Sequence, residues 1–329
     1  MTGVRLVDRE MTDKAWSTLV TGRAADDGTY EVDDILRKGL ADYLVVTNPI
    51  FVYDRFQDAY VQIPNRFATG REVACGATCR LDSWEVVKDR YEVEQNRKIL
   101  SRAISLVNKY GDAAKLMGCG VLDDGRKFFA VVHTGSLSIT TANNDTDVVD
   151  SYVIVMSSHD GSIPICYYNL DTRRNTHIVY RFNASKEYEF SVRKRHTPSE
   201  ADLDGEAREV LNMRASWSQH VVNNISHMSV PVSQTYIESA LETVWPLKTA
   251  NTEKKREHIE SVHSRVKTLY SSSHNSGSYG PSKWALFNAM TEYIDFHRNI
   301  PDREAAQHAL EIDNFSHRLK LEVHKCLSS

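Results

Sequence analysis

The hydrophobic period of this chain changes near residue 198, and that change limits the folds available to it. Before that point, β-branched and aromatic residues gather in short extended runs such as 43–53 (YLVVTNPIFVY). After it, apolar residues recur at three- and four-residue steps, the period of an amphipathic helix. We therefore expect an α+β fold, in which residues 1–198 are rich in antiparallel β-sheet and residues 199–329 form a helical part packing on that sheet. The two parts form either separate domains or one compact domain.

The strand-rich part contains a strong hairpin signal and one inserted helix. Residues 118–133 read GCGVL, then Asp123-Asp124-Gly125, then RKFFAVVH. Asp-Gly between two apolar runs is typical of a tight turn between paired strands. A helix is expected near 95–110, with Gly111 as its stop. Further strands are expected at 43–53, 150–156, 163–170 and 176–182.

The helical part carries its own start and stop signals. Thr252 is the expected N-cap of a helix, and Pro281 with Ser282 opens another. Between these helices, residues 271–280 (SSSHNSGSYG) are rich in Ser and Gly and predict a flexible loop. The buried side of the last helix is expected to include Phe315.

Composition excludes several classes of protein. The 329 residues carry a net charge of -4, so no global positive field draws the chain to a polyanion. The first residues are charged and do not resemble a signal peptide, and no apolar run is long enough to span a membrane. Five scattered cysteines are typical of free thiols in a reducing cytoplasm. We expect a cytoplasmic protein with no membrane partner.

Four segments, in order along the chain, resemble a family found in phages and plasmids and known as domain of unknown function 932. They are 87–96 (VKDRYEVEQN), 157–162 (SSHDGS), 192–197 (VRKRHT) and 284–298 (WALFNAMTEYIDFHR). The resemblance implies a protein of a mobile genetic element that acts in the cytoplasm of a bacterial host.

The chain departs from this family at one informative place. Members usually show Val-Cys-Gln-Asn-Thr between the second and third segments, whereas the matching stretch here is Arg173-Arg174-Asn175-Thr176. The cysteine that could serve as a nucleophile is therefore absent. Arginine at both positions favours a surface that faces anions.

A local excess of positive charge surrounds that stretch. Between residues 173 and 197, seven cations stand against two acids, which gives +5 in a chain whose total is -4. Aromatic residues alternate with these charges, and such platforms can stack on unpaired bases while the cations neutralise phosphates. The alternative is that the aromatics enter the core while the charges face water. The expected nucleic-acid-binding residues are Arg173, Arg174, Arg181, Lys186, Arg193, Lys194, Arg195 and His196.

The His159-Asp160-Gly161 sequence is the strongest candidate for a catalytic site. A carboxylate beside an imidazole can orient a general base or a metal ligand. The alternative is a tight turn in which Asp160 caps backbone amides. An enzyme would need these residues to share a pocket with Asn175 and His196.

Cofactor and metal patterns are incomplete. Cys75 and Cys79 lack a second pair at zinc spacing, and no glycine loop has the sequence of a phosphate cradle. We therefore expect no metal and no cofactor.

Three functions remain open. The first is a nucleic-acid-binding protein, for example one that binds or anneals single-stranded DNA in recombination or replication. A basic cluster on a sheet that is followed by helices is similar to the layout of ring-forming single-strand annealing proteins. This is an analogy of architecture alone. The second is an enzyme, such as a hydrolase or an anti-defence factor. The third is a non-catalytic assembly protein, and a homo-oligomer is compatible with each of the three.

Overall fold

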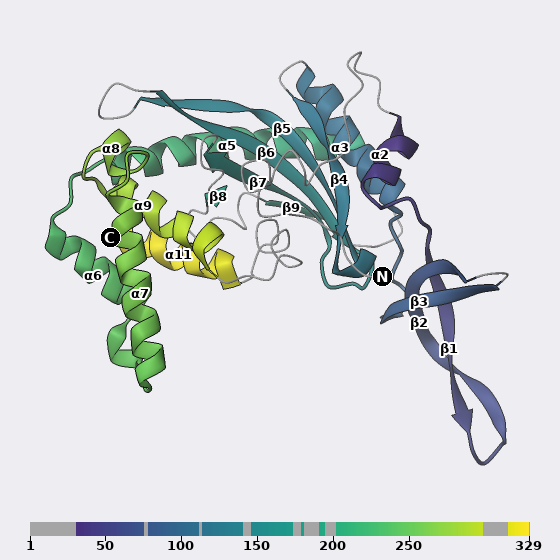
Figure 1. Ribbon diagram of the computed structural model, residues 1–329. Helices are drawn as coiled ribbons and strands as arrows, with labels where there is room; N and C mark the ends of the chain where they lie inside the picture. Colours follow the sequence, from purple (N-terminus) through teal and green to yellow (C-terminus); the bar gives the residue numbers. More distant parts are fainter. Residues whose placement is uncertain are drawn as a thin grey trace.

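Two antiparallel sheets and a group of C-terminal helices make up the computed structural model (Figure 1). The structure describes residues 31–75, 78–111, 114–140, 146–173, 179–180, 191–194, 202–298 and 315–328. Strands dominate the first half of the chain and helices dominate the second, which confirms the α+β prediction.

The first sheet stands off one end of the molecule (Figure 1). Its strands are β1 (Val45–Asp54), β2 (Ala59–Cys75) and β3 (Thr78–Lys88), paired antiparallel in that order. The strand expected at 43–53 is confirmed as β1. The end of the β1–β2 hairpin extends beyond the reach of β3, because β3 pairs with β2 only from Arg66 onward.

The second sheet is the centre of the fold. Its strands are β4 (Lys115–Leu122), β5 (Lys127–Thr140), β6 (Thr146–Ser158), β7 (Ile165–Arg173), β8 (Val179–Tyr180) and β9 (Ser191–Lys194). The order is β4-β5-β6-β7, and both β8 and β9 pair with the outer edge of β7. The hairpin expected at 118–133 is confirmed, and its turn is a short helical segment over Asp123–Gly125. The strand expected at 176–182 is described only over Val179–Tyr180.

Two helices cover one face of this sheet (Figure 1). They are α3 (Asn96–Tyr110) and α5 (Leu203–Met228), and α2 (Val32–Lys38) lies beside α3. Their apolar stripes pack on Val132, Val153 and Tyr167 in one buried cluster. Each large side chain buried in this way contributes roughly 1.5–3 kcal/mol. The helix expected near 95–110 is confirmed as α3.

The C-terminal helices form a second core at the far end of the molecule. They are α6 (Gln234–Val244), α7 (Glu253–Tyr270), α8 (Ser276–Tyr279), α9 (Lys283–Glu292), a π-helical turn (Tyr293–His297) and α11 (Phe315–Ser328). Trp284 and Phe287 stack at the centre of this core. No helix in the described ranges is both long and apolar enough to cross a membrane.

The expected helix starts are confirmed, and one expected core residue is wrong. The hydroxyl of Thr252 accepts from the Lys255 amide, and the hydroxyl of Ser282 accepts from the Ala285 amide. Phe315, however, is 57% exposed at the start of α11, where the guanidinium of Arg298 lies over its ring.

The segment expected to be a flexible loop, residues 271–280, has a different structure. It contains α8 and buries Asn275 and Tyr279 against the surrounding helices. Buried contacts therefore order a segment whose composition alone predicts a solvated linker.

Candidate functional site

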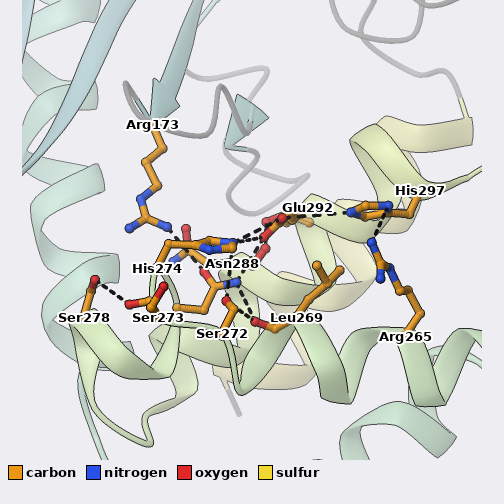
Figure 2. Close-up of polar contacts among 12 residues, drawn as sticks. Arg173, Arg265, Leu269, Ser272, Ser273, His274, Ser278, Asn288, Glu292 and His297 are labelled. Carbon is orange, nitrogen blue, oxygen red and sulfur yellow. Dashed lines mark hydrogen bonds and ion pairs between the residues drawn. The ribbon is translucent and has the colours of Figure 1, made fainter. Parts of the chain in front are cut away.

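Glu292 lies at the end of α9, where the helix widens into the π-helical turn. Its carboxylate accepts hydrogen bonds from His274 Nε2 and from Asn275 Nδ2, each 3.0 Å from Oε2 (Figure 2). His297 Nε2 lies 4.0 Å from Oε1. A π-helical turn brings side chains five residues apart closer together than an α-helix does, and such turns occur frequently at functional sites. Two imidazoles therefore flank one carboxylate.

The turn after α7 positions two of these partners. Asn275 is fully buried, and its Nδ2 also donates to the carbonyl of Leu269 at 3.0 Å. The hydroxyl of Ser272 donates to the same carbonyl at 2.6 Å. These bonds fold the turn back onto the last residues of α7, so that His274 reaches Glu292.

Arg173 connects this cluster to the central sheet. At the end of β7, its Nη1 donates to Asn275 Oδ1 at 3.3 Å (Figure 2). Its Nε donates to Asp147 Oδ2 on β6 at 2.7 Å. The guanidinium carbon also lies 4.8 Å from the centre of the Tyr279 ring. We call Asp147, Arg173, His274, Asn275, Glu292 and His297 the junction cluster, since it joins the sheet to the C-terminal helices.

Hydrogen bonding determines the charge on Glu292. Burial alone would raise the pKa of this carboxyl, but the nearby His297 imidazole and the hydrogen bonds from His274 and Asn275 outweigh burial and leave the pKa below its ordinary value. Glu292 is therefore an anion at neutral pH, surrounded by donors.

The same bonds select the tautomers of the two histidines. Because His274 uses its Nε2 hydrogen for Glu292, its Nδ1 is the basic nitrogen of the neutral ring, and the side chain is 39% exposed. His297 Nδ1 accepts from Arg265 Nη2 at 3.2 Å, because a guanidinium can only donate. The cluster thus holds one solvent-accessible imidazole in a fixed orientation, as general-base chemistry requires.

His159 and Asp160 lie apart from this cluster, in the turn between β6 and β7. His159 is fully buried, its Nε2 is 2.7 Å from Asn96 Oδ1, and its ring stacks on Trp84 at 5.7 Å. Asp160 Oδ1 accepts from the Ser162 amide at 2.9 Å, and Gly161 has a φ of 77°. The interpretation of this sequence as a capped Asp-Gly turn is therefore confirmed. Asn175 and His196 lie outside the described residues.

The basic segment is described at its two ends. Arg173 is buried in the junction cluster, so the structure gives it an internal partner in place of a surface role. On β9, Arg193 is exposed and Lys194 forms an ion pair with Glu209 at 2.9 Å. The remaining predicted binding residues lie outside the described residues, namely Arg174, Arg181, Lys186, Arg195 and His196.

Part of the junction cluster carries a signal in the sequence. Glu292 and His297 fall inside the segment 284–298, one of the four that carry the family resemblance. His274 and Asn275 carry none, because a Ser-rich turn predicts solvent exposure. Within the described ranges, no three His, Cys, Asp or Glu side chains converge as metal ligands.

Comparison with known proteins gives one match. A family model described as Domain of unknown function (DUF932) matches residues 83–318. No curated protein and no solved structure matches the chain. The matched range includes the central sheet, α3, α5 and every residue of the junction cluster.

Proposed function

The chain belongs to the family of domain of unknown function 932, because the match covers more than half of its 329 residues, and we propose that this member binds single-stranded nucleic acid. The observation that carries the proposal is the pairing of both β8 and β9 with β7. The chain leaves β7 at Arg173 and returns to the same edge at Ser191. The basic segment therefore begins and ends along one edge of the central sheet.

The charge of the basic segment remains positive after internal pairing is subtracted. The segment 173–197 carries seven cations and two acids, and Arg173 is neutralised by Asp147. Six cations against two acids leave +4. The Lys194–Glu209 pair is partly exposed on both sides, so it contributes little and can open for a phosphate. A local excess of this size attracts a polyanion even when the whole chain is acidic.

Single strands are the preferred form because of the interleaved aromatics. Tyr180, Phe182, Tyr188 and Phe190 alternate with the cations along the segment. An aromatic ring stacks on an unpaired base with roughly 1–3 kcal/mol, whereas the bases of a duplex are already stacked. Binding or annealing of single strands in recombination or replication of a mobile element would use such an edge.

The test is the salt dependence of binding to a labelled oligothymidylate, followed by fluorescence anisotropy. Each phosphate that the protein neutralises contributes about -0.7 to the slope of log affinity against log salt. The variant Arg193→Glu/Arg195→Glu should abolish binding. A matched reversal on the exposed side of α11, Arg318→Glu/Lys325→Glu, changes the net charge equally and should leave most of the affinity.

Two results would contradict this proposal. One is undetectable binding of the wild-type protein at low salt. The other is equal loss of affinity in the two double variants, because that would show a response to net charge and not to the β9 edge.

The junction cluster favours a second candidate function, general acid–base catalysis of hydrolysis. His274 would accept a proton from an attacking water through Nδ1, while Glu292 stabilises the resulting imidazolium. An enzyme was the second function left open by the sequence. The catalytic residues proposed here differ from the four candidates named there, which are His159, Asp160, Asn175 and His196. A catalytic role is not needed for nucleic-acid binding, so the two functions can be tested separately.

The test is hydrolysis of activated carboxylate and phosphate esters over a range of pH. If His274 is the general base, the rate of hydrolysis depends on pH through this residue, and His274→Ala removes that dependence. His258→Ala is the control, because His258 is an exposed histidine on α7 outside the cluster. Identical profiles for both variants would contradict the catalytic role.

A further inference from the structure

Exposed apolar side chains concentrate in the first sheet and in the segment just before it. Of twelve large hydrophobic residues that are strongly exposed in the described part of the chain, nine fall between residues 40 and 86. These nine are Leu40, Leu44, Phe51, Val52, Tyr53, Phe56, Tyr60, Val61 and Val86. Single exposed apolar residues are ordinary, whereas a concentration of them marks an interaction surface.

The end of the β1–β2 hairpin carries the core of this surface. We call strands β1 to β3 the arm, and residues 51–62 its ribbon. The ribbon is only two strands wide, and Phe56 at its turn is fully exposed. Tyr53 and Tyr60 pair across it with ring centres 5.4 Å apart. A two-stranded ribbon is marginally stable in water by itself, and its open strand edges invite pairing.

The charge of the arm argues against a polyanionic partner. Residues 45–88 contain five Lys and Arg and five Asp and Glu, so their net charge is zero. Phosphate groups, whether of nucleic acid or of anionic lipid, would gain no net attraction here. The arm therefore fits a protein partner.

The distribution of charge along the arm identifies that partner. Asp54 and Asp58 flank the turn of the ribbon, and Arg66 and Lys88 are direct cross-strand neighbours nearer the body. Like charges directly opposite each other destabilise a sheet. In the described part of the chain, neither Arg66 nor Lys88 has an ion-pair partner. The turn of the ribbon, with Asp54, Arg55 and Asp58, thus carries a net charge of -1, whereas Arg66 and Lys88 together carry +2 at the other end.

We propose that two copies of this chain associate through their arms, laid side by side and antiparallel. Asp54 and Asp58 at the tip of each arm then contact Arg66 and Lys88 of the other copy. Oppositely charged side chains therefore meet at both ends of the contact. Phe51, Tyr53 and Tyr60 lie between these charged ends. A two-fold contact of this kind has an apolar centre and a polar rim, as stable interfaces do.

The first experiment is light scattering of the full-length protein over a range of concentrations without nucleic acid. The wild-type protein should be a dimer at micromolar concentration, and Phe56→Ser/Tyr60→Ser should be monomeric. Val222→Ser is the control, because Val222 is also an exposed apolar residue but lies on α5. A wild-type monomer, or a dimer that persists in the ribbon variant, would overturn the proposal.

A charge exchange tests the antiparallel arrangement itself. Arg66→Glu/Lys88→Glu and Asp54→Lys/Asp58→Lys should each be monomeric, since each places like charges at both ends of the contact. An equimolar mixture should form a heterodimer, because both ends then attract. The mixture also shows that the variants are folded, so loss of the dimer cannot come from misfolding. If the mixture stays monomeric, the arrangement is wrong.

Discussion

Arg173 donates from Nε to Oδ2 of Asp147 at 2.7 Å, and both side chains are 3% exposed. An ion pair so deeply buried gains from attraction but loses the hydration of both charges. Its net contribution to stability can therefore be small, while the loss of one partner leaves an uncompensated charge in the interior.

Asp147→Asn should destabilise the protein by about 3–5 kcal/mol, since it leaves the Arg173 guanidinium without a counter-ion. Urea unfolding followed by far-UV circular dichroism measures this change. The double variant Asp147→Leu/Arg173→Met should recover much of the loss, because both charges are gone. A single variant as stable as the wild type would show that water reaches the guanidinium.

Glu292→Gln should change how stability depends on pH. The pKa of Glu292 lies below its ordinary value in the folded protein, so its carboxylate contributes stability above the unfolded pKa, near 4.5. That contribution is lost as pH falls through the lower folded pKa. The glutamine variant should be less stable at neutral pH by about 1–3 kcal/mol, with a shallower decline below pH 4.5. Urea midpoints measured across the acid range provide the test.

The buried imidazole of His324 should make the protein less stable as pH falls from 6.5 to 4. Burial, together with the nearby His220, lowers the pKa of this imidazole to about 4 from an ordinary value of 6.5. The unfolded chain therefore binds the extra proton first, and stability falls as pH drops from 6.5 to 4, by at most roughly 3 kcal/mol. His324→Gln should flatten this part of the curve, whereas His258→Gln on the surface of α7 should not. Equal slopes in both variants would contradict the buried neutral imidazole.

Sequence periodicity predicts the elements whose own residues determine them. The hairpin around Asp123-Asp124-Gly125 and the helix over Asn96–Tyr110 were both expected, because turn chemistry and a 3.6-residue stripe are local properties. Strands β2 and β3 were not expected. Apolar residues such as Tyr60, Val61 and Val86 are exposed in them, so their sequence lacks the regular alternation of a strand with one buried face.

The junction cluster shows where local reasoning fails. Ser272, His274 and Asn275 occupy a segment whose composition predicts a solvated loop, and only the contacts with Glu292 and Arg173 bury it. Likewise, Arg173 belongs to a basic run that predicts a surface, yet Asp147 lies across the adjacent strand and holds it inside. Partners distant in sequence decide both outcomes, and the local spacing of apolar and charged residues does not depend on those partners.

His159 provides the sharpest test of a structural role against a catalytic one. Its Nε2 contacts Asn96 Oδ1 at the start of α3, and its ring stacks on Trp84 of β3, so it joins the arm to the body of the protein. His159→Ala should cost about 2–4 kcal/mol, because it leaves a cavity and an unsatisfied buried acceptor. Urea unfolding followed by tryptophan fluorescence measures the loss, and affinity for single-stranded DNA per folded molecule should be unchanged. A variant with full stability but without ester hydrolysis would instead restore His159 as a catalytic residue.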